Sequence, residues 1–321
     1  MTMRKQKHLF RAPGKKFLLL KLFLLLASAG EAQQLALYSQ FMVNDYVMNP
    51  AIGGRHDYFE AMSANRYQWI GITDAPRTYI LSVNGPGKRK NIGLGGYLFT
   101  DIVGPTRRIG VDFTYAYHAK LSDNIKLSLG LSAGILQFAV DGSKITLHDP
   151  VDLVISNGYQ SVLLPDFGAG FYLYGPNWWF GSAVPQIYPA RIKFFDYTSD
   201  SQGKLSTHSY TMGGYKFHVG DDFIVEPSFL VKYVYPAPVQ LDLGLRCIYK
   251  EKMWVGGGFR TMDAFSVMAG YVYEQNLSVS YSYDFTTTNI RNYSTGTHEI
   301  VLSIRFGKTQ TSGSGNNSRI E

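Results

Sequence analysis

The sequence predicts an all-β fold, a transmembrane antiparallel β-barrel of about 14 strands. In residues 277–285 apolar side chains at odd positions alternate with Ser or Asp at even positions, so a strand here has one apolar and one polar face. About a dozen segments share this pattern, and downstream of residue 32 no apolar run approaches the roughly twenty residues of a membrane-spanning helix. A soluble periplasmic β-sandwich is the alternative. The recurrence of an apolar face of similar length in nearly every segment favours the barrel.

Residues 1–32 have the pattern of a cleaved secretory signal peptide. A basic stretch that ends at Lys16 precedes an apolar run from Phe17 to Ala27, and small residues lead to Ala32, where we expect cleavage. The alternative is a membrane anchor, but the apolar run is too short to span a bilayer as a helix. These residues hold seven of the 31 Lys and Arg and one of the 24 Asp and Glu. The remainder therefore has a net charge near neutrality, which gives no support to nucleic-acid binding.

Turn residues and the period of two divide the rest of the chain into 14 candidate strands. We expect them at 57–66, 76–84, 91–100, 106–120, 123–139, 164–174, 177–184, 207–219, 222–235, 238–250, 252–260, 263–274, 276–286 and 296–307.

The connections alternate in length, which is an independent indication of a barrel. Every second connection is short, whereas the long ones, at 67–75, 140–163, 185–206 and 287–295, all belong to the other set. Bacterial barrels have short periplasmic turns and longer extracellular loops. An even strand count places both ends of the barrel domain on the periplasmic side.

Two segments fall outside the strand pattern. Residues 33–55 are too irregular for a transmembrane strand and too apolar for a free tail, so we expect a periplasmic segment that plugs the lumen. The barrel domain then covers 56–307. Residues 308–321 are rich in Gly, Ser, Asn and Thr, and we expect a disordered periplasmic tail.

The strand phase assigns a set of charged residues to the lumen, because a charge on the lipid face is costly. An ion-pair network that fills the barrel is favoured over a selective channel. The predicted lumen charges are Asp112, Lys126, Glu226, Lys232, Asp242, Arg246, Asp284, Glu299 and Arg305.

The sequence offers no catalytic, cofactor or metal site. The histidines are scattered, without the close spacing of a metal site. Cys247 is the only cysteine and shares its strand phase with Leu243 and Leu245, which indicates a lipid-facing position rather than a reactive thiol. An outer-membrane hydrolase would need a nucleophile and a base side by side, and the strand pattern does not bring such a pair of residues together.

Three stretches in the first third of the mature chain resemble the PorP/SprF family. The first is Tyr-Ser-Gln-Phe-Met-Val-Asn at 38–44 with Met-Asn-Pro-Ala at 48–51. The second is Arg-Tyr-Gln-Trp-Ile-Gly-Ile at 66–72, followed by Asp-Ala-Pro-Arg-Thr at 74–78. The third is Ile-Gly-Leu-Gly-Gly at 92–96 with Asp-Ile-Val-Gly-Pro at 101–105. The later two thirds match mainly as a generic barrel.

The resemblance implies an outer-membrane protein of the type IX secretion and gliding systems of Bacteroidetes. Its barrel would be similar to long-chain fatty acid transporters, with an N-terminal segment inside. The implied partners are the outer-membrane bilayer, other type IX components and a secreted cargo protein with a C-terminal sorting domain, which the barrel would export or anchor. The alternative function is passive transport of hydrophobic or small solutes.

The residues singled out for partner binding or gating come from the first two stretches. A loop tip with exposed aromatic and aliphatic side chains often marks a partner contact, but Trp69 could equally fold back to close the barrel mouth. The set is Tyr38, Gln40, Asn49, Pro50, Gln68, Trp69, Gly71 and Pro76.

Overall fold

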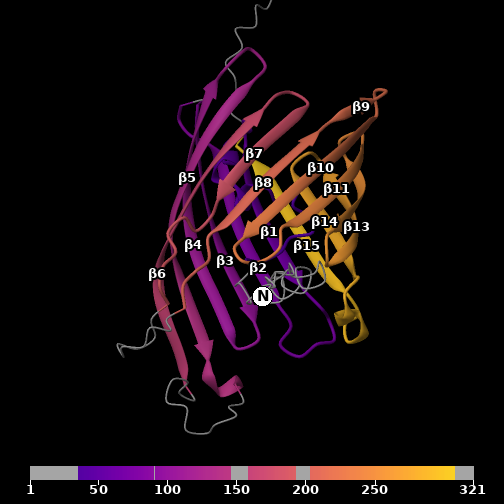
Figure 1. The fold of residues 1–321 in the computed structure, drawn as a ribbon. Coiled ribbons are helices and arrows are strands. Elements are labelled where there is room, and N and C mark those ends of the chain that lie inside the picture. The colour runs from indigo at the N-terminus through magenta and orange to yellow at the C-terminus, as the bar shows by residue number, and fades with distance from the viewer. Residues whose placement is uncertain (1–34, 90, 146–157, 193–202, 308–321) are drawn as a thin grey trace, which may run out of the picture.

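The chain folds into a closed antiparallel β-barrel (Figure 1). The structure, a computed structural model, describes residues 35–89, 91–145, 158–192 and 203–307. The predicted signal peptide and the 308–321 tail lie outside these ranges. The strands are β1 (Phe59–Tyr67), β2 (Arg77–Pro86), β3 (Ile92–Val103), β4 (Thr106–Lys120), β5 (Lys126–Asp141), β6 (Tyr159–Tyr174), β7 (Trp178–Val184), β8 (His208–Tyr215), β9 (Phe217–Val219), β10 (Phe223–Val234), β11 (Gln240–Tyr249), β12 (Met253–Arg260), β13 (Ala264–Tyr273), β14 (Leu277–Thr286) and β15 (Thr297–Phe306).

The predicted count of 14 strands is confirmed. β1 pairs with both β2 and β15, and β10 pairs with β11, so the sheet closes on itself. β8 and β9 are separated by Lys216 alone and both pair with β10. They therefore occupy one position in the wall.

The two faces of the wall differ in polarity as the alternation predicts. In β4, Asp112, Thr114 and His118 are buried, whereas Phe113 and Tyr115 are 69% and 47% exposed. Large apolar side chains lie exposed on the outer face in the same phase in most strands. The outside of the barrel therefore matches the apolar interior of a bilayer.

β6 begins at Tyr159, five residues before the expected position, so the prediction was wrong there. Val162, an inward residue of this part, and the next inward residue, Leu164, are apolar and break the alternation. Ile192 and Leu205, two described residues of the connection after β7, pack with them in the same buried cluster. This apolar contact explains why two inward positions of β6 are apolar where the alternation predicts polar residues.

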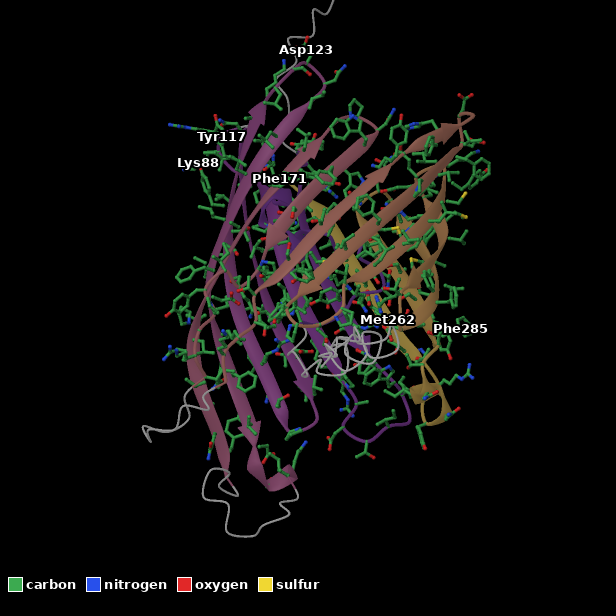
Figure 2. The ribbon with its side chains drawn as sticks, in the orientation of Figure 1. Lys88, Tyr117, Asp123, Phe171, Met262 and Phe285 are labelled. Atoms are coloured by element: carbon green, nitrogen blue, oxygen red, sulfur yellow. The ribbon has the colours of Figure 1, made fainter. Side chains whose placement is uncertain are left out.

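All the long connections lie at one end of the barrel, here called the long-loop end, and the other end, here called the short-turn end, has short turns (Figure 1). Lys88 and Asp123 mark the short-turn end in Figure 2. β5 and β6 extend beyond their neighbours at the long-loop end. None of the helices in the described ranges has the length and apolar character to cross a membrane.

Candidate functional site

Residues 35–58 run through the inside of the barrel before the chain enters β1. The backbone N–H of Leu35 donates to His208, the first residue of β8, at the long-loop end. Gly54 lies against Gly85 and Gly93 near the short-turn end. Two short 3₁₀ helices, η1 (Tyr46–Met48) and η2 (Pro50–Ile52), form the middle of this lumen segment.

The lumen segment packs on several sides of the wall at once. Its buried apolar side chains form one cluster with inward residues of β6, β8, β10, β12 and β13. The cluster contains Phe41, Met42, Tyr46, Met48, Ala51, Ile52, Tyr172, Tyr210, Met212, Leu230, Trp254 and Met268.

Inward glycines of the wall make room for η2. A Cβ at Gly130 of β5 would overlap the backbone of Pro50 and Ala51, and one at Gly170 of β6 would overlap the Asn49 side chain. Asn49 fixes the turn, because its amide donates to the carbonyl of Phe171 at 3.0 Å and its Oδ1 accepts from the N–H of Ala51 at 3.0 Å. Pro50 is the first residue of η2, where its fixed φ suits the helix start.

The start of the lumen segment binds a buried ion network at the long-loop half. The guanidinium of Arg66 contacts Asp284 at 2.9 Å and Glu299 at 3.0 Å, and all three side chains are at most 3% exposed. The Ser39 hydroxyl donates to Asp284 at 2.5 Å, and its N–H donates to Glu299 at 2.8 Å. Gln40 donates to Glu299 through its N–H, at 3.1 Å. Because the segment's own groups donate hydrogen bonds to both carboxylates, its position is coupled to the network.

A second arginine holds the neighbouring backbone. Arg260 contacts Asp242 at 2.7 Å and Asp263 at 3.0 Å, and also donates to the carbonyl of Tyr38 at 2.8 Å. Lys232 lies 2.7 Å from the other oxygen of Asp242. Burial raises the pKa of the Tyr38 hydroxyl well above its ordinary value, so Tyr38 is neutral.

Near its other end, the lumen segment has an internal ion pair and a hydrogen bond to Tyr172 of the wall. Arg55 contacts Asp45 at 2.6 Å and donates to the hydroxyl of Tyr172 at 2.9 Å. Burial raises the pKa of Asp45, although the charge of Arg55 opposes this. Burial alone would lower the pKa of Arg55, but Asp45 and Tyr172 raise it above its ordinary value.

The structure places most predicted lumen charges on the inner face, but not in one site. Asp242, Asp284 and Glu299 join the network around Ser39, with Lys232 beside Asp242. Arg246 pairs with Glu226 at 2.8 Å in a separate contact. The others lie apart: Asp112 is buried, Arg305 contacts Glu60 at 3.1 Å, and Lys126 is exposed at the start of β5.

Two basic residues that organise the site, Arg66 and Arg260, are not among the predicted site residues. Arg66 appeared within the loop stretch 66–72, but it is a β1 residue in phase with the buried Met62 and Ala64. Arg260 ends β12 in phase with the buried Trp254. Strand phase alone would have found both.

The stretch 68–76 forms a structured loop at the long-loop end. The Gln68 N–H donates to the carbonyl of Pro76 at 2.9 Å, which closes the loop. Ile70 exchanges backbone hydrogen bonds with Gly296 and Thr295 of the last long loop. Gly71 has φ +103°, a conformation that favours glycine.

The loop tip presents apolar side chains of both connections. Trp69 is half-buried and its N–H donates to the Thr297 hydroxyl at 3.1 Å, whereas Ile70 is 42% and Tyr293 76% exposed. The first and last long loops therefore form one joined surface.

The described residues of the site contribute ion pairs, hydrogen bonds and apolar contacts. In the described ranges, no group of three or more His, Cys, Asp or Glu residues could hold a metal ion. Two small spaces border the lumen segment, one beside Ser39 and Arg260 and one beside Asp45 and Arg55. Each has a volume of about 10 Å³, which suits about one water molecule.

Residues 30–304 match the family model of the type IX secretion system membrane protein PorP/SprF. No curated protein matches the chain. Among solved structures, the toluene transporter TodX of Pseudomonas putida aligns with a TM-score of 0.47 and 8% identity, over 83% of this chain and 93% of that one. The CymD monoaromatic hydrocarbon channel gives 0.46 and 13%, over 86% and 94%. A FadL homologue of Pseudomonas aeruginosa gives 0.43 and 12%, over 77% and 88%.

Proposed function

Because the chain belongs to the PorP/SprF family of type IX secretion system membrane proteins, we propose that it is a closed, non-enzymatic adaptor that supports export or surface anchoring of a secreted partner. It is an outer-membrane β-barrel. The observation that carries the proposal is the lumen segment, which is hydrogen-bonded to the wall near both ends, through Ser39 and Arg55. Its middle packs against inward glycines of the wall. A barrel filled in this way suits holding a protein better than passing solutes.

The lumen segment is the plug of this adaptor. Ser39, Gln40 and Tyr38 bind the network at one end, and Arg55 binds Asp45 and Tyr172 at the other. Release would leave buried carboxylates such as Glu299 without these partners, which costs free energy. The plug therefore stays docked at rest.

The partner binds the joined surface of the first and last long loops. Ile70 and Tyr293 are exposed there, and the backbone bonds of Ile70 hold the surface rigid. Rigid aromatic and aliphatic anchors bind partners at low entropic cost. We infer that the partner is a secreted protein with a C-terminal sorting domain, delivered by other type IX components.

Co-purification tests this function. The barrel is extracted in mild detergent from cells that secrete their normal surface proteins, and bound proteins are identified by mass spectrometry. A secreted protein with a sorting domain is expected with the wild type and depleted at least tenfold with the double variant Ile70→Ser/Tyr293→Ser. The matched control Tyr235→Ser changes another exposed tyrosine, 78% exposed, outside the joined surface.

Two results would overturn the proposal. One is a barrel that brings down no secreted protein although it is folded. The other is liposomes with the wild-type barrel that take up small hydrophobic solutes faster than empty liposomes, which would indicate a transporter.

A further inference from the structure

The outer face of the wall carries almost no charge. Among the described strand positions whose side chains point outward, charged residues occur only at Arg77 in β2, Arg107 in β4 and Asp141, the last residue of β5. The charge of Asp141 has local hydrogen-bond partners, because its carboxylate accepts from the N–H and the hydroxyl of Ser143. The two arginines are therefore the exception that needs an explanation.

The two arginines lie close together. Arg77 pairs with Ile102 of β3, and Ile102 pairs with Arg107, so all three share one row across adjacent strands. Two strand spacings separate the Cα atoms of the arginines by about 10 Å. Both side chains are exposed, and their length allows the two guanidinium groups to reach one anion.

The row lies just beyond the apolar band, at the long-loop end. The next outward row contains Tyr79 and Thr100, and the row after it is apolar, with Leu81 and Leu98. Four residues along a tilted strand correspond to about 10 Å of depth. The arginines therefore lie at the level of lipid headgroups when the apolar band is in the bilayer.

Aromatic side chains flank the row, as expected at a membrane interface. Tyr67 packs edge-on against Tyr79, with ring centroids 5.8 Å apart. Tyr67 itself pairs with Arg77 across the β1–β2 ladder. The site is thus continuous with the part of the wall that contacts lipid.

Neither arginine has an ion-pair partner in the part of the chain that the structure describes. Guanidinium groups bind phosphate oxygens through paired charge-assisted hydrogen bonds. We propose that Arg77 and Arg107 together bind a phosphate group of a lipid in the outer leaflet. The site orients the barrel in the membrane and does not depend on the function proposed above.

Native mass spectrometry of the full-length detergent-extracted protein tests this inference, with added diphosphoryl lipid A as the probe. The wild type is expected to retain bound lipid A, and Arg77→Gln/Arg107→Gln to bind it at least tenfold more weakly, an order-of-magnitude expectation for losing two charge-assisted contacts. The matched control is Lys88→Gln/Arg89→Gln, which removes two charges from the opposite end of the same β2–β3 hairpin. Heat-dependent migration on SDS gels confirms that each variant is folded.

Dephosphorylated lipid A distinguishes phosphate recognition from packing. The wild type is expected to bind it as weakly as the double variant binds the phosphorylated form. Unchanged lipid A binding by the double variant would overturn the proposal. So would a double variant that loses affinity for phosphorylated and dephosphorylated lipid A by the same factor. Loss of a co-purified acidic protein with unchanged lipid binding would assign the arginines to a protein partner instead and would also overturn it.

Discussion

Gly130→Val is the substitution that should release the lumen segment. A Cβ at Gly130 already overlaps the backbone of Pro50 and Ala51, and backbone atoms cannot rotate away as a flexible side chain can. Overpacking of this kind costs about 1–3 kcal/mol, which changes the ratio of docked to released segment by about 5- to 150-fold. The barrel wall should stay folded, because the inserted side chain points into the lumen.

Planar-bilayer conductance measures the effect. The wild type is expected to be largely closed, and Gly130→Val to open more often by the factor above. Gly257→Val is the matched control, because Gly257 faces outward in β12 and a Cβ there meets only the Ser266 carbonyl at 3.6 Å. Trypsin should also cleave after Arg55 faster in Gly130→Val, since this side chain is 24% exposed when docked. A folded Gly130→Val that stays as closed and as protected as the wild type would refute the reasoning.

The remaining predictions concern the ends of the lumen segment and the loop surface. Arg66→Met should lower the free energy of unfolding by about 3–5 kcal/mol, because Glu299 loses its cation and Asp284 keeps only the longer contact with Arg260, at 3.7 Å. The gel-shift temperature of this variant should fall, and adding Glu299→Gln should restore part of the loss. Asn49→Ala removes the hydrogen bonds to the Phe171 carbonyl and the Ala51 N–H. Docking of the lumen segment should therefore weaken by about 1–2 kcal/mol, and conductance should rise modestly. Conductance equal to that of the wild type would contradict this. Gly71→Ala strains a residue at φ +103° by about 1–3 kcal/mol, so protease should cleave the 68–76 loop faster without changing conductance.

The strand count and the lipid-facing phase could be predicted because both follow from local alternation. In β4 every second residue from Arg108 to His118 is polar or small, and each of them is buried. The start of β6 could not be predicted, because Val162 is apolar to match a cluster that contains Leu205, a residue of a connection far along the chain.

Which residues contact one another at the candidate site could not be predicted from the sequence either. Ser39 and Glu299 are 260 positions apart, and only closure of the barrel between β1 and β15 brings them together. The pattern predicted that Glu299 lines the lumen but gave no means to pair it with Ser39. Arg66 has the phase of the buried face, but it stands at the end of β1 beside the loop stretch and was therefore not counted among the lumen charges.

Maleimide labelling in outer-membrane vesicles tests most directly whether the lumen segment is docked. The measured quantity is the rate at which a thiol at position 39 reacts. The variant Ser39→Cys in a Cys247→Ser background changes one buried oxygen to sulfur, at a side chain that is 4% exposed. Its reference is Ser122→Cys, in the exposed turn between β4 and β5. A docked segment predicts that position 39 reacts at least about a hundredfold more slowly than position 122, because the reagent must wait for release of a network that costs about 3 kcal/mol or more to open. Equal rates at the two positions would contradict the account.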